Sequence, residues 1–143
     1  MSSSIIFQDE FRIEGKNPEG KKFEKVDRLV GKGLVYEVSM LVDVNSEIYD
    51  VKTEETVTVA LASSLGSGTE TYEQARGRAS LLDAYDYAMC GVAYKYKHVA
   101  GSQVEVHISH GGLLARFVGD EKHLCDVKVD QTVYTLVRKA KGL

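Results

Sequence analysis

The sequence predicts an all-β domain of about eight short strands, arranged as a small barrel or a sandwich. Apolar residues recur at every second position in several short segments, as they do in half-buried strands. Glycines separate these segments, and the single proline among 143 residues leaves them uninterrupted. This length suits one hydrophobic core, so we expect residues 1–143 to form a single domain.

Three strands are expected in the first part of the chain. At the amino end, the apolar residues that share one parity are Ile5, Phe7, Phe11 and Ile13. Residues 34–45 predict one long strand, whose inward side chains are Leu34, Tyr36, Val38, Met40, Val42 and Val44. The Gly31-Lys-Gly33 stretch predicts a break in the chain before that strand. Residues 56–62 repeat the alternation, with Val57, Val59 and Leu61 on one face.

The remaining strands are expected after residue 83. Residues 84–97 are apolar at both parities, which predicts a strand buried on both sides with Gly91 at a bend or bulge. Three further strands are indicated by the sets Val104, Val106, Ile108; Leu113, Ala115, Phe117; and Val133, Thr135, Val137. Gly111-Gly112 predicts a hairpin, and Asp120 is placed to cap a helical turn that runs through Leu124.

One segment departs from the alternating pattern. Residues 63–82 are polar, rich in glycine and not periodic. We expect them to form a long mobile loop within the domain.

The composition limits the possible partners. The formal net charge is −3, whereas binding of nucleic acid without sequence preference needs a clear basic excess. No uncharged apolar run approaches the roughly 20 residues of a membrane span, and the amino end does not resemble a signal peptide, so we expect no membrane partner. Cys90 and Cys125 form no CxxC pair, which favours a reducing compartment.

Residues 107–112, His-Ile-Ser-His-Gly-Gly, suggest a hydrolase at first sight. The nucleophile elbow needs a glycine two residues before the serine, and this chain has His107 there. A zinc site is also disfavoured, because His107 and His110 face opposite sides of a strand and only one residue separates His123 from Cys125. Calcium, phosphate and dinucleotide motifs are absent from the sequence. We therefore expect no catalytic residue, no metal and no cofactor.

A nucleic-acid surface is the second possibility. On a strand, Tyr94, Tyr96 and His98 would share one face, and Lys95 and Lys97 would share the other. Small barrels bind single strands by stacking bases on aromatic side chains beside a basic groove. The alternative reading is that the tyrosines fill the core and the lysines only face solvent.

Five segments resemble one known family. They are NPEGKKFEKVDRL (17–29), LVDVNSEIYDV (41–51), YDYAMCGVAYK (85–95), ISHGGLLARFVGD (108–120) and VDQTVYTLVRKA (129–140). Together they resemble the small subunit shared by eukaryotic nuclear RNA polymerases I, II and III, sometimes called subunit ABC3. His110 and Cys90 depart from this pattern, because the family usually has tyrosine at both places.

The resemblance implies a closed antiparallel barrel of OB-like arrangement and a subunit that is not catalytic. It implies docking on the outside of the largest polymerase subunit, support of assembly, and location in the nucleus, including the nucleolus. Neither a small-molecule substrate nor direct contact with nucleic acid is expected. The alternative is an independent OB-type domain that binds single-stranded nucleic acid through Tyr94, Lys95, Tyr96 and Lys97.

The segment after the expected hairpin is our candidate for partner binding. Gly111 and Gly112 suit either a tight turn or close approach by another chain. Leu113 and Leu114 face opposite sides of the following strand, and Arg116 shares the parity of Leu114. We expect Gly111, Gly112, Leu114 and Arg116 to serve packing of the barrel, docking of a partner, or both.

Overall fold

A computed structural model describes residues 5–17, 25–64 and 85–139 of the chain. Within this part, the strands are β1 (Ile5–Lys16), β2 (Val26–Gly33), β3 (Ser39–Asn45), β4 (Thr56–Ala62), β5 (Tyr87–Ala100), β6 (Gln103–His110), β7 (Leu113–Asp120) and β8 (Thr132–Lys139). One short helix, α2 (Glu121–Leu124), follows β7. The predicted loop at 63–82 lies outside the described residues except for Ser63 and Ser64.

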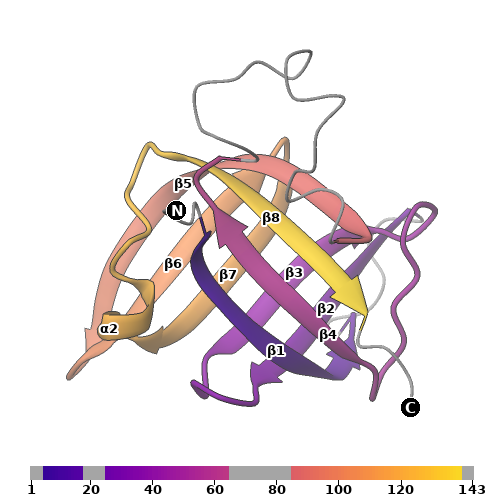
Figure 1. The fold of residues 1–143 in the computed structure, drawn as a ribbon, viewed down its shortest axis with the longest axis horizontal. Helices are drawn as coiled ribbons and strands as arrows, with labels where there is room; N and C mark the ends of the chain where they lie inside the picture. The colour runs from indigo at the N-terminus through magenta and orange to yellow at the C-terminus, as the bar shows by residue number, and fades with distance from the viewer. Residues whose placement is uncertain (1–4, 18–24, 65–84, 140–143) are drawn as a thin grey trace.

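The eight strands close into one antiparallel barrel in the order β1-β2-β3-β7-β6-β5-β8-β4, with β4 returning to β1 (Figure 1). The predicted closed antiparallel barrel is therefore confirmed. Strand β5 has two neighbours along its length, because residues 87–92 pair with β8 and residues 92–100 pair with β6. In the part of the chain that the structure describes, no helix is long and apolar enough to cross a membrane.

Alternate side chains of every strand fill the barrel. The bulkiest of those that are fully buried are Phe11, Phe117, Ile13, Leu29, Leu61 and Ile108. The rings of Phe7 and Phe117 meet edge to face, with centroids 5.9 Å apart. Leu124 and Val127, from α2 and the turn after it, join the same buried cluster. The Asp120 carboxylate accepts the N–H of Lys122 at 3.0 Å, which confirms the predicted cap of this helical turn.

The long strand predicted over residues 34–45 is wrong in its first part, because β3 begins only at Ser39. Leu34, Val35 and Tyr36 are 57%, 68% and 41% exposed, respectively, in a turn between β2 and β3. The Asp9 carboxylate of β1 holds this turn by accepting the backbone N–H groups of Val35 at 3.3 Å and Tyr36 at 3.0 Å. A distant carboxylate thus overrides the local alternation.

The predicted chain break at Gly31-Lys-Gly33 is also wrong, since both glycines belong to β2. Here glycine permits close pairing of two strands. A Cβ on Gly31 would lie 2.6 Å from the carbonyl oxygen of Arg12 on β1, which no side chain tolerates.

Strand β5 is buried on one side only, contrary to the prediction of two buried faces. Tyr87, Met89, Gly91 and Ala93 are buried, whereas Ala88, Cys90 and Val92 between them are exposed. The register shifts against β6 lie at residues 93–95 and 98–100, so Gly91 is not at a bulge. Its place is explained by β6, because a Cβ on Gly91 would collide with the carbonyl oxygen of Ser109 and would approach the ring carbon Cδ2 of His110 to 2.7 Å.

Candidate functional site

The hairpin predicted at Gly111-Gly112 is confirmed, with His110 at the end of β6 facing Leu113 at the start of β7. Gly111 has φ 63° and Gly112 has φ 105°. Two-residue hairpin turns of type I′ need positive φ at both central residues, and glycine adopts it without strain. Space around both Cα atoms is open, so the turn alone accounts for the two glycines.

Leu114 and Arg116 lie on the outer side of β7, alternating with the buried residues Ala115 and Phe117. Both are half-buried. The backbone N–H of Leu114 donates to Asp43 Oδ2 of β3 at 3.1 Å. The hairpin is therefore tied to the neighbouring strand at the residue that we predicted to meet a partner.

Asp43 is the polar centre of this region. It is 4% exposed, and it also accepts two hydrogen bonds from the Arg28 guanidinium of β2, at 2.7 Å from Nε and 3.0 Å from Nη2. Two parallel hydrogen bonds of this kind fix the orientation of the guanidinium relative to the carboxylate as well as the distance between them. Sequence reasoning missed Asp43 and Arg28, although both stand at outward positions of strand-like segments. Which cation meets which carboxylate depends on the pairing of β2 with β3.

Strands β2, β3, β7, β6 and β5 are neighbours, and their outward residues form one continuous surface, which we call the five-strand face. Strand pairing aligns these residues in three rows. The rows are Arg28, Asp43, Leu114, Ser109, Val92; then Val30, Leu41, Arg116, His107, Lys95; then Lys32, Ser39, Val118, Glu105, Lys97. Leu114 and Arg116 thus lie near the middle of the face, whereas Gly111 and Gly112 lie at its edge.

The aromatic residues proposed for nucleic-acid stacking do not share a face. A register shift at residues 93–95 leaves Tyr94 outside, 50% exposed and edge-on to the His107 ring at 5.7 Å. Tyr96 is instead packed against the core, and burial raises its pKa. The predicted common face of Tyr94, Tyr96 and His98 is therefore wrong. Lys95 and Lys97 are exposed on the five-strand face.

The two histidines of the His-Ile-Ser-His stretch have separate partners. His107 lies on the outside and contacts Glu105 Oε2 through Nε2 at 2.7 Å. This hydrogen bond is the largest cause that holds the pKa of Glu105 below its usual value, and the charges of His107, Arg116 and Lys95 add to it. Burial of the carboxylate opposes them.

His110 lies inside the barrel and is 7% exposed. Its Nε2 is 2.7 Å from the Thr135 hydroxyl of β8, and its Nδ1 is 3.2 Å from the Leu113 carbonyl oxygen. Burial lowers the pKa of His110, and the Leu113 carbonyl and the Asp43 charge oppose that shift. Its ring therefore joins β6, β7 and β8 instead of activating Ser109. Among the described residues, no group of three His, Cys, Asp or Glu side chains could hold a metal ion.

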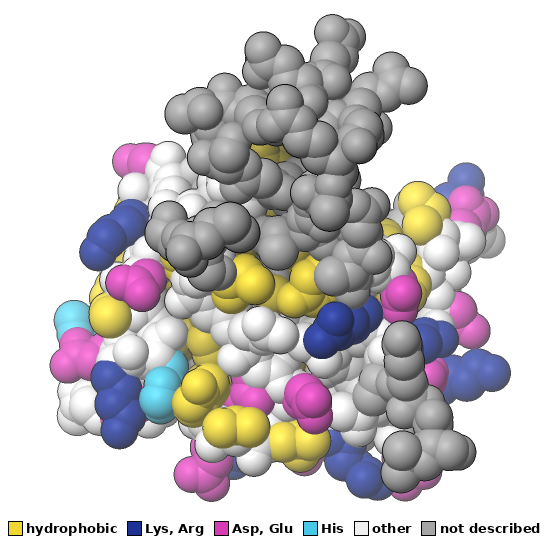
Figure 2. Space-filling model, viewed as in Figure 1, with side chains coloured by type: hydrophobic (Ala, Val, Ile, Leu, Met, Phe, Trp, Pro, Cys, Tyr) yellow, Lys and Arg dark blue, Asp and Glu magenta, His cyan; other side chains and the backbone are white. Residues whose placement is uncertain are grey.

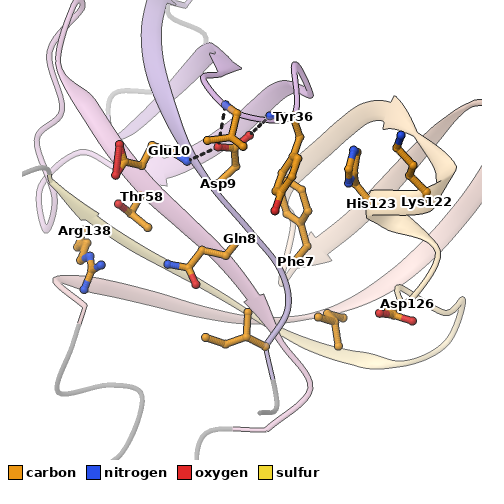
Figure 3. Close-up of a pocket in the computed structure, with 13 residues that line it drawn as sticks. Phe7, Gln8, Asp9, Glu10, Tyr36, Thr58, Lys122, His123, Asp126 and Arg138 are labelled. Atoms are coloured by element: carbon orange, nitrogen blue, oxygen red, sulfur yellow. Dashed lines mark hydrogen bonds between the residues drawn. The ribbon is translucent and has the colours of Figure 1, made fainter. Parts of the chain in front are cut away.

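A hollow of about 620 Å³ lies beside β1, open to solvent (Figure 3). Its walls include Phe7, Gln8 and Tyr36, and the Tyr36 ring stacks on His123 of α2 at 4.2 Å. The Asp9 carboxylate at its floor already accepts three backbone N–H groups, from Glu10, Val35 and Tyr36. These contacts brace the turn after β2, so we assign this hollow a structural role.

Comparison with known proteins identifies the family. The sequence model described as RNA polymerase Rpb8 matches residues 8–139. A Dictyostelium discoideum protein named "DNA-directed RNA polymerases I, II, and III subunit rpabc3" is 37% identical, over 96% of this chain and 99% of its own. An Arabidopsis thaliana protein named "DNA-directed RNA polymerases II, IV and V subunit 8B" is 34% identical, over 96% and 98%. A Saccharomyces cerevisiae protein named "DNA-directed RNA polymerases I, II, and III subunit RPABC3" is 32% identical, over 96% and 99%. The chain belongs to the RNA polymerase Rpb8 family.

Proposed function

We propose that this protein is a non-catalytic structural subunit of the nuclear DNA-dependent RNA polymerases, which docks on their largest subunit and supports assembly. The observation that carries the proposal is the family match over residues 8–139. Relatives of nearly equal length are named as subunits shared by several polymerases. Their names differ in the polymerases that they list: polymerases I, II and III in one case, and polymerases II, IV and V in another. The proposed location is the nucleus, with the nucleolus included where polymerase I is a partner.

The contacts around the histidines support a role without catalysis. A general base must reach a nucleophile within about 3 Å. His107 contacts Glu105 and Tyr94, and His110 contacts Thr135 and the Leu113 carbonyl. Each ring thus has structural partners of its own.

We assign docking to the five-strand face around Leu114 and Arg116. Leu114 is half-buried, and its backbone N–H donates to Asp43, so its place on β7 is fixed relative to β3. Arg116 makes no ion pair with the described residues, and its guanidinium is free to meet a carboxylate of the partner. Gly111 and Gly112 contribute the turn that brings β7 into this position.

The test is a tagged pull-down from nuclei, with mass spectrometry of the proteins that co-purify. We expect the largest polymerase subunits with the unaltered chain. Arg116→Glu and Leu114→Ala should each lower their recovery about tenfold, as loss of an interface anchor does. The matched controls are Lys52→Glu and Ile48→Ala, because Lys52 is exposed and Ile48 is 71% exposed, and both lie in the loop between β3 and β4, outside the three rows. Equal recovery with folded variants and controls contradicts the docking site. Absence of polymerase subunits with the unaltered chain contradicts the function.

The second candidate is binding of single-stranded nucleic acid. One observation favours it, namely that Tyr94 is 50% exposed beside Lys95 and Lys97. It predicts affinity for a mixed-sequence oligonucleotide that falls steeply as salt rises. Tyr94→Ala with Lys95→Ala and Lys97→Ala should then abolish binding, whereas Tyr96→Phe should leave it unchanged, because Tyr96 faces the core.

A further inference from the structure

The five-strand face is positively charged in a chain whose net charge is −3. In its three rows the cations are Arg28, Lys32, Lys95, Lys97 and Arg116, and the carboxylates are Asp43 and Glu105; Asp120 lies beyond these rows, at the end of β7. On the face shown in Figure 2, with β4 and β8 toward the viewer (Figure 1), the basic and acidic side chains in view are intermixed. The excess of basic side chains is thus a local property of the five-strand face.

The two carboxylates of the three rows already have partners within the protein. Asp43 is paired with Arg28 at 2.7 Å, and Glu105 contacts His107 at 2.7 Å. Lys32, Lys95, Lys97 and Arg116, in contrast, make no ion pair with any residue that the structure describes. Lys95 and Arg116 lie near enough to Glu105 for their charges to help lower its pKa.

Apolar side chains lie between these cations. They are Val30, Leu41, Leu114 and Val118, each half-buried, and Val92, which is 44% exposed. Neighbouring strands are about 4.8 Å apart and alternate residues about 6.8 Å apart, so the three rows cover roughly 19 by 14 Å. This area is smaller than one side of a typical protein–protein interface, so it would form the centre of an interface and not the whole of it.

We propose that the segment of the polymerase that covers the five-strand face is acidic and apolar, with carboxylates placed against Lys95, Lys97 and Arg116 and aliphatic side chains against Leu114 and Leu41. This inference rests on the proposed function and adds the chemistry of the partner to it. A protein segment fits better than nucleic acid, because the exposed apolar side chains are mainly aliphatic and Tyr94 is the exposed aromatic ring beside them. Bases need several aromatic surfaces for stacking.

The first experiment reverses charge within the full-length chain. Lys95→Glu/Lys97→Glu is compared with Lys52→Glu/Lys122→Glu, which changes the net charge equally at exposed lysines elsewhere. We expect the first pair to lower recovery of polymerase subunits from nuclei about tenfold, and the control to leave it unchanged. Recovery should also fall with rising salt. Thermal unfolding of each variant confirms that the barrel is intact.

The second experiment identifies what covers the face. The photo-crosslinker p-benzoylphenylalanine replaces Val92 in one variant and Ile48 in the control, and crosslinked peptides are sequenced. We expect position 92 to capture a polymerase segment with more Asp and Glu than Lys and Arg. A neutral or basic segment, nucleic acid, a second copy of this chain, or no crosslink overturns the inference.

The two proposals fail in different ways. If Leu114→Ala lowers recovery of polymerase subunits but Lys95→Glu/Lys97→Glu behaves like its control, docking stands and the acidic partner is wrong. If the unaltered chain recovers no polymerase subunit, the proposed function fails, and the present inference fails with it.

Discussion

Two turns of this barrel are each held by a buried aspartate from another strand. Asp9 of β1 accepts the N–H groups of Val35 and Tyr36 in the turn after β2, and Asp43 of β3 accepts the N–H of Leu114 just after the β6–β7 hairpin. Both aspartates are 4% exposed. They differ in charge balance, because Asp43 pairs with Arg28 whereas Asp9 makes no ion pair with the described residues.

The difference shows two ways to keep a carboxylate inside a protein. Around Asp9 the compensation comes from backbone N–H dipoles, which cannot be removed by a side-chain substitution. Around Asp43 it comes mainly from a guanidinium, which can. The turn after β2 should therefore tolerate surface changes nearby, whereas the five-strand face depends on one pair of charges.

The largest expected effect is at Asp43. Asp43→Ala should lower the free energy of unfolding by about 3 kcal/mol, because Arg28 and the Leu114 N–H both lose their acceptor. Denaturation in urea measures it. The control is Asp50→Ala, since the Asp50 side chain is 62% exposed and lies 3.9 Å from Lys16. A loss no larger than that of the control would contradict the difference drawn between the two aspartates.

Asp9→Asn should cost less, about 1.5 kcal/mol, because one acceptor oxygen remains. Its signature is local: the amide hydrogens of Val35 and Tyr36 should exchange faster with solvent than in the unaltered protein. Glu10→Gln is the control, since Glu10 is exposed. Unchanged exchange at both amides would show that the carboxylate does not hold this turn.

The smallest expected effect on stability concerns His110, which lies on the inner side of the β6–β7 hairpin. Burial lowers the pKa of His110 from 6.5, so the folded protein favours the neutral ring. The stabilisation is complete above the unfolded pKa and is lost as pH falls through 6.5 towards the lowered value. Between about pH 7.5 and about pH 5.5 we therefore expect the free energy of unfolding to fall. His110→Phe should remove that dependence, measured as the difference between the two urea titration midpoints. An identical dependence in both proteins would show that another group titrates.

The strands that the sequence predicted well are those whose pattern and turn are both local. The β6–β7 hairpin is an example, because Gly111 and Gly112 need no distant residue to adopt positive φ. Closure of the barrel was predicted from family resemblance, since alternation alone fits a sandwich as well.

The missed features depend on pairs that are distant in the chain. Leu34 to Tyr36 alternate with the strand that follows, yet Asp9 holds two of their amides from about 26 residues away. No residue type around positions 93–95 indicates the register shift there, and this shift turns Tyr94 away from Tyr96. Arg28 and Asp43 were visible as charges, but their contact exists only once β2 and β3 are in register.

The position of β8 has a consequence for synthesis of the chain. β8 is last in sequence among the strands, yet it lies between β4 and β5 and pairs with both. Until residues 132–139 have left the ribosome, β4 and β5 each keep an open edge that can pair with any other nascent strand. A polypeptide released before β8 is therefore not a shorter barrel but an open sheet, whose free strand edges favour aggregation.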